Sequence, residues 1–249
     1  MHKAEHQEEQ DYSFKKYFVP FTTLKAVHFI IIIGIVVFFN SLFNGFVGDD
    51  SGQLVRNTFV HSISNIPAFF LSSTFDSGNG IAGVYYKPLL LTTFSFIYSI
   101  WGPNPFPFHL IQVLLHITNA LLVFFLFKKF IDNKWAFLLS IIFLVHPINQ
   151  DTAAYISNYQ DVLFFFFGML ALLVSTSKKT KYVYLKVFPL LALSVLSKET
   201  GIAFLFINLV YIFLFNKEIF KKTFIYSLLF FIAYNLLHYY VVGMHFTGV

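Results

Sequence analysis

Long apolar runs alternate with short polar segments along the chain from residue 26 onward. A helix of about 20 apolar residues crosses the hydrocarbon core of a bilayer, and several of these runs approach that length. The pattern predicts an all-α integral membrane protein with about seven transmembrane helices. We place them at residues 26–43, 108–127, 135–148, 153–174, 182–196, 202–215 and 223–242.

The composition supports this fold class and excludes others. Hydrophobic residues make up 57% of the 249 positions and charged residues only 12%, which is more apolar surface than a soluble domain of this length buries. The chain has no cysteine, so it has no disulfides and no thiolate metal sites. The net charge of +5 comes from short lysine clusters between the apolar runs, which is typical of membrane topology, and we expect no nucleic-acid partner.

Two polar segments divide the chain. Residues 1–25 are polar and charged and are predicted to form a cytoplasmic tail before a single membrane domain at residues 26–249. Residues 197–200 interrupt an apolar stretch that would form a helix of about 50 Å if it were continuous, much longer than a bilayer is thick. We therefore expect the tip of a tight hairpin at this second segment.

The lysines determine the predicted topology, including the role of the short apolar run at residues 89–101. Cytoplasmic loops carry an excess of lysine and arginine. If this run is an interfacial helix on the outer side, 14 of the 17 basic residues lie inside, whereas counting it as a span leaves 5 inside and 12 outside. We therefore expect the N-terminus inside, the C-terminus outside, and a long first outer loop at residues 44–107 that carries interfacial helices.

This topology brings unusual ionisable residues to the outer face, where charges next to apolar helices are often functional. Asp49 and Asp50 follow the first predicted span, and two adjacent carboxylates at that place have no use in packing. The other candidates are Lys87, His146, Asp161, Lys198 and Glu199. An ordinary structural role stays open for each candidate. The two aspartates would form a solvated turn, and Lys198 would pair with Glu199. Lys87 would start a helix, Asp161 would cap a helix beginning at Val162, and His146 would end a helix.

Five motifs follow the acidic pair in a fixed order. They are Tyr86-Lys87-Pro88-Leu89, Phe108-His109-Leu110 with His116 and Asn119-Ala120, His146-Pro147, Asp161 at the head of a span, and Ser197-Lys198-Glu199. This order resembles the glycosyltransferase C superfamily, and within it the transmembrane O-mannosyltransferases that carry tetratricopeptide repeats. The similarity extends over about residues 46–242.

The resemblance implies a glycosyltransferase-C-like fold and an enzyme that takes mannose or another hexose from a polyprenyl or dolichyl phosphate carrier. The acceptor would be a protein, lipid or glycan on the outer or lumenal face, and the membrane a bacterial cytoplasmic membrane, or the endoplasmic reticulum in a eukaryote. Two features depart from the family. Asn158-Tyr159-Gln160 stands where an arginine often precedes the residue that matches Asp161, and the chain ends at Val249 soon after the seventh span, so we expect a C-terminally incomplete domain.

The implied chemistry needs a base for the acceptor hydroxyl and positive charge for the leaving phosphate. Asp49 or Asp50 is the expected base, either because repulsion makes one of them a better proton acceptor or because the pair shares a divalent metal. Candidates for binding the donor are Lys87, Lys198, Glu199, Asp161 and His146. Direct displacement would invert the sugar, and the alternative is a non-catalytic membrane protein, such as a carrier-lipid transporter or an assembly partner.

Overall fold

The computed structural model describes residues 21–75, 85–176 and 183–246, and every regular element in these residues is a helix. Most of the predicted tail and the lysines at 178, 179 and 181 lie outside the described residues. The long helices are α2 (Thr23–Phe38), α4 (Pro88–Trp101), α5 (Pro105–Phe127), α6 (Asn133–Val145), α8 (Tyr159–Ser175), α9 (Tyr184–Ser197), α10 (Ile202–Phe215) and α11 (Lys217–Phe246). The fold is therefore all-α, as the apolar pattern predicts.

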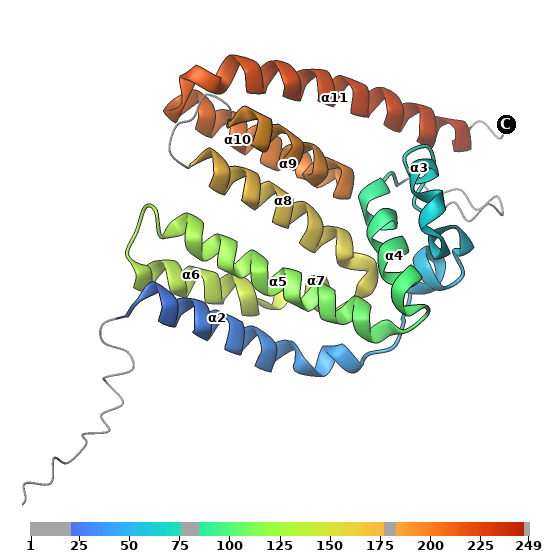
Figure 1. Cartoon of the computed structure of the whole chain (residues 1–249), viewed down its shortest axis with the longest axis horizontal. Coiled ribbons are helices and arrows are strands. Elements are labelled where there is room, and N and C mark those ends of the chain that lie inside the picture. The colour runs from blue at the N-terminus through green and yellow to red at the C-terminus, as the bar shows by residue number, and fades with distance from the viewer. Residues whose placement is uncertain (1–20, 76–84, 177–182, 247–249) are drawn as a thin grey trace, which may run out of the picture.

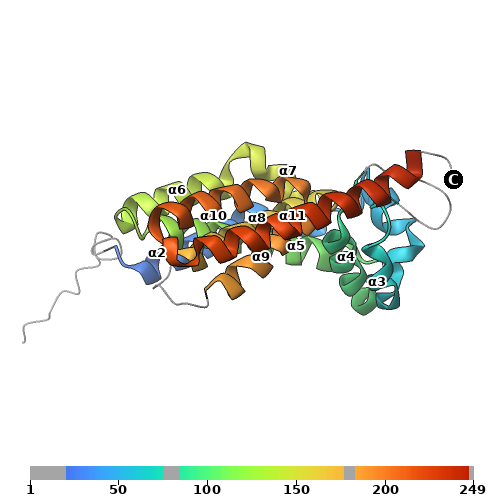
Figure 2. The ribbon, with the colours of Figure 1, turned by 90° about the horizontal axis from the view of Figure 1, so that it is seen from above.

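The long helices other than α4 lie roughly side by side, with α2 and α11 at opposite edges and α5 and α8 between them (Figure 1). The helix α4 and the short α3 (Ile66–Phe69) lie across one end of this bundle, which we name the α4 end (Figures 1 and 2). Half of the apolar window of α5 and of α8 is buried, but only 22% of that of the α2 segment and 17% of that of α11. The core is therefore built on α5 and α8.

Four segments are long and apolar enough to cross a membrane, namely Thr23–Phe43, Pro105–Phe127, Ile156–Ser175 and Lys217–Val242. The other apolar helices have 10–17 residues. Large apolar side chains are exposed on the outside of the bundle, as expected for surfaces that face lipid. The chain is thus a multi-pass membrane protein with four candidate spans, and the count of seven spans stays a prediction.

Two helices begin at residues other than the predicted ones, each for a local reason. The helix predicted at residues 153–174 begins at Tyr159, because Tyr155 is extended and separates the short α7 (Gln150–Ala154) from the next turn. The helix α11 begins six residues before the predicted 223, because its lysine-rich start is polar but consists largely of good helix formers.

The predicted hairpin between α9 and α10 is confirmed. The helix α9 ends at Ser197, Lys198 is extended, and one turn, η7 (Glu199–Gly201), leads into α10. A Cβ atom at Gly201 would lie 2.4 Å from the carbonyl oxygen of Ser194, so only glycine allows this close return. The turn fixes Lys198 and Glu199 at the α4 end.

Single-cysteine labelling tests the predicted topology, because the chain has no cysteine of its own. We expect an impermeant thiol reagent to label Ser64→Cys and Pro103→Cys from outside but not Asp132→Cys. The exposed positions 103 and 132 flank α5, so they must lie on opposite sides if α5 spans the membrane. Outside labelling at 132 without labelling at 103 would show that α4 is a span and that the lysine-based orientation is wrong.

Candidate active site

Asp50 is completely buried and its carboxylate ties two distant segments together. One oxygen accepts the backbone N–H of Ser157 at 2.8 Å and its hydroxyl at 2.5 Å, and the other accepts the backbone N–H of Val47 at 2.9 Å. Charge-assisted hydrogen bonds of this kind are stronger than neutral ones. Asp50 therefore fixes the loop before it against η6 (Ile156–Asn158).

Asp49 has the opposite arrangement, since its backbone is fixed while its side chain is exposed. Its N–H donates to the Tyr155 hydroxyl at 2.7 Å, and its carbonyl oxygen accepts the N–H groups of Gly52 and Gln53. Gly48 before it has a φ of 51°, and a Cβ atom there would lie 2.7 Å from the same Tyr155 hydroxyl. Among the described residues, no hydrogen bond or ion pair reaches the Asp49 carboxylate, which is therefore available for chemistry.

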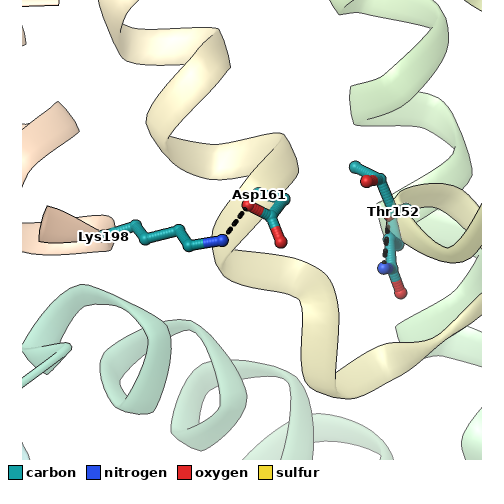
Figure 3. Close-up of polar contacts among 4 residues, drawn as sticks. Thr152, Asp161 and Lys198 are labelled. Carbon is teal, nitrogen blue, oxygen red and sulfur yellow. Dashed lines mark hydrogen bonds and ion pairs between the residues drawn. The ribbon is translucent and has the colours of Figure 1, made fainter. Parts of the chain in front are cut away.

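Asp161 and Lys198 form an ion pair of 2.5 Å across two helices, with side chains 19% and 29% exposed (Figure 3). Asp161 lies in the first turn of α8, where a carboxylate suits the helix dipole. Because α8 begins at Tyr159, the interpretation of Asp161 as the cap of a helix beginning at Val162 is wrong. The pairing of Lys198 with Glu199 is likewise not found, since Lys198 binds Asp161.

Lys87 completes a set of charges at the α4 end. It is buried directly before α4, and its ammonium lies 4.4 Å from the centre of the Tyr85 ring. Burial lowers the pKa of Lys87, and the positive charge of Lys198 lowers it further. Three carboxylates raise it. These carboxylates are Asp161, Glu199 and Asp49. The charges of the other four residues therefore all act on Lys87, and we name the five residues the charged cluster.

Glu199 is held by a residue that the sequence pattern did not single out as functional. His238 of α11 lies 3.1 Å from the Glu199 carboxylate, and the rings of Tyr86 and Tyr234 lie against the imidazole. Burial raises the pKa of Tyr86 to about 12, so it stays neutral and donates its hydroxyl hydrogen to the carbonyl of Phe70. These contacts dock α11 onto the charged cluster.

His146 lies apart from this network. It ends α6, as predicted from His146-Pro147, and its Nδ1 accepts the backbone N–H of Ile148. Its exposed ring lines two cavities, but no hydrogen bond or ion pair among the described residues connects it to the charged cluster. The structure gives His146 a role at a helix end and in a cavity wall.

The aspartate pair does not fit a shared divalent ion. Both oxygens of Asp50 already accept hydrogen bonds, so only Asp49 has a free carboxylate. The described residues contain no group of three or more histidine, aspartate or glutamate side chains arranged to hold a metal. We therefore derive no step that depends on a metal at this pair.

Comparison with known proteins identifies the family of the chain. The family model described as dolichyl-phosphate-mannose-protein mannosyltransferase matches residues 87–240, more than half of the chain. The chain belongs to this family. The resemblance to the glycosyltransferase C superfamily is thereby confirmed. The match to the mannosyltransferase family includes Lys87, Asp161, Lys198 and Glu199, whereas the aspartate pair precedes it.

Curated members with related sequences carry the same kind of name. Human protein O-mannosyl-transferase TMTC3 is 29% identical over 192 residues, 73% of this chain and 21% of the relative. Protein O-mannosyl-transferase F38B6.6 of Caenorhabditis elegans is 28% identical over 70% of this chain and 26% of its own length. Human TMTC1 is 32% identical over 53% of this chain and 16% of its own length. The chain thus spans about a quarter or less of these relatives, and no solved structure matches it.

The two aspartates of this chain should respond differently to neutralisation. Asp50→Asn places an NH2 group against donors and should destabilise the fold by about 1–3 kcal/mol, whereas Asp49→Asn should change stability by less than about 0.5 kcal/mol. Thermal unfolding of the two variants in detergent measures the difference. Ser157→Ala, which removes only the hydroxyl bond to Asp50, is the intermediate control, and equal melting temperatures for all three would contradict the assignment.

Proposed function

We propose that the chain is the membrane part of a mannosyltransferase that moves mannose from a polyprenyl phosphate carrier to a hydroxyl group of a protein on the outer or lumenal face. The observation that carries this proposal is the free carboxylate of Asp49, whose charge acts on the ammonium group of Lys87, together with the ammonium group of Lys198, whose charge also acts on Lys87. A base and a phosphate-binding charge are the two things that the transfer requires. The names of the family and of the relatives support mannose as the sugar and protein as the acceptor.

The proposed reaction is a single displacement. Asp49 accepts the proton of the acceptor hydroxyl as its oxygen attacks C1 of the sugar. The bond between C1 and the phosphate oxygen breaks, and the electron pair leaves with the phosphate. The carrier phosphate gains negative charge, which the ammonium groups of Lys198 and Lys87 stabilise, and the configuration at C1 inverts.

Asp161 is proposed to position Lys198 for this role. The ion pair holds the ammonium at the hairpin tip, where it would otherwise be mobile on a flexible side chain. The Lys198 ammonium has three donor hydrogens, and Asp161 does not use all of them. Asp161 and a phosphate can therefore bind the same ammonium together. Glu199, held by His238, contributes to the field at Lys87 rather than to the phosphate.

An apolar cavity of about 530 Å³ supports a lipid-linked donor. It lies between α5, α6, α8 and α10, and Phe204 and Phe165 form part of its wall. Phe204 contacts Phe164, and the Phe164 ring lies 5.9 Å from the ammonium of Lys198. A polyprenyl chain in this cavity would therefore lead to the proposed phosphate site.

Replacing Asp49 tests the function directly. Asp49→Asn should lower transfer from mannosyl-phosphoryl-polyprenol by at least about a hundredfold, since general-base catalysis contributes about 10²–10⁴, while the protein remains folded in the membrane. Transfer is measured with radiolabelled donor and protein acceptor, with chelator present in parallel to reveal any metal requirement. Wild-type-like transfer by Asp49→Asn would exclude the proposed base, and donor binding without any transfer by the wild type would favour a carrier-lipid transporter.

Alkaline pH tests the role of Lys87. An ammonium binds phosphate only while it is protonated, and because burial lowers the pKa of Lys87, donor binding should weaken at a lower pH than an ordinary lysine would allow. Lys87→Arg should extend donor binding to higher pH, because guanidinium stays charged. The donor KM is measured against pH, with the exposed Lys186→Arg as control. Identical alkaline limbs in the wild type and Lys87→Arg would show that Lys87 does not bind the phosphate.

A further inference from the structure

A second cavity, of about 400 Å³, has a different character from the apolar one. It lies between the C-terminal ends of α2 and α6 and the short α7, and both polar and apolar side chains line it. Three carboxamides face it, those of Asn40, Asn44 and Gln150. Phe38 and Val145 supply apolar wall, and the volume lies in the usual range for ligand pockets.

The carboxamides are free to bind a ligand. All three residues are exposed, and in the described part of the chain no hydrogen bond engages the side chain of any of them. Each carboxamide offers one acceptor oxygen and two donor hydrogens. Three such groups on one cavity wall match a ligand that alternates donors and acceptors.

Each of two walls of the cavity is linked to Asp49, one through the chain and the other through a hydrogen bond. Asn44 is five residues before Asp49, and the loop between them leads into a turn in which the N–H of Asp50 donates to the carbonyl of Val47. On the other wall, Ala154 is followed by Tyr155, whose hydroxyl accepts the N–H of Asp49. Asp49 is not itself part of the cavity wall, but this hydrogen bond holds its backbone next to the neighbour of a wall residue.

We propose that this cavity is the acceptor subsite, and that it holds an extended, uncharged polypeptide segment whose serine or threonine hydroxyl faces Asp49. The assignment rests on the proposed function and names where its acceptor binds. Peptide N–H and C=O groups pair with the carboxamides, and the apolar wall takes the side chains beside the hydroxyl residue. Binding of the acceptor here leaves Lys87 and Lys198 to the donor.

The lining favours a polypeptide over the other ligands of a membrane surface. A lipid headgroup phosphate calls for lysine or arginine, and the cavity wall has neither. A sugar is usually held against the face of a tryptophan, tyrosine or phenylalanine ring, and the only such ring in the wall is Phe38, which is 6% exposed and packs against His116. The other ring in the wall, that of His146, accepts the backbone N–H of Ile148.

The test uses the chain reconstituted in vesicles and a neutral peptide with one serine and a benzophenone side chain two residues away. We expect crosslinks to the cavity wall, and a roughly two- to tenfold rise in the peptide KM for Asn40→Leu and for Gln150→Met, since each removes one hydrogen-bonding group. The donor KM should not change. Asn235→Leu, which alters an exposed carboxamide on α11, is the matched control and should leave both values unchanged.

Each outcome separates this inference from the proposed function. Transfer with an unchanged peptide KM in both cavity variants, or crosslinks elsewhere, would overturn the subsite and leave the function intact. Crosslinks in the cavity without any transfer would support the subsite and overturn the function. Protection of the cavity by a soluble glycan but not by the unlabelled peptide would show that the occupant is not a polypeptide.

Discussion

The carboxylate of Asp50 is the contact on which the rest of the site depends. It joins a loop after the first long helix to a segment 107 residues later, through three hydrogen bonds inside the protein. A buried carboxylate without partners would be very costly, so these bonds also enforce one arrangement of the two segments. Asp49 and Tyr155 are placed by the same junction, which is why the backbone that carries the exposed carboxylate has a fixed position.

The charged cluster shows a second constraint, the need to balance charge beside apolar helices. Asp161 pairs with Lys198 and Glu199 with His238, each across elements far apart in sequence. Lys87 has no such direct partner among the described residues, and the field of three carboxylates only partly offsets its burial. In the proposed function, a bound phosphate would supply the direct anionic partner that Lys87 lacks.

The apolar pattern predicts most of the helices, and the polar interruption at 197–200 predicts the hairpin, because the bilayer sets the length of a span. The different roles of the two adjacent aspartates were harder to predict. Two adjacent aspartates look equivalent in sequence, and only the position of Ser157 makes Asp50 structural. His238 was equally hidden, since its partner lies 39 residues away across a hairpin. Contacts between distant segments leave no periodic signal, so neither could be predicted.

The number of available carboxylates bears on the stereochemistry of the proposed transfer. A double displacement would need one carboxylate to attack the sugar and another group to activate the acceptor, as in retaining glycosidases. Asp50 is engaged by Ser157 and Val47, and Asp161 and Glu199 are each paired with a cation or an imidazole. Asp49 is then the one carboxylate of the described cluster without a direct partner. A single free base suits the proposed single displacement, in which the acceptor would approach from the cavity side of Asp49 and the phosphate from the lysine side, and the sugar would be inverted.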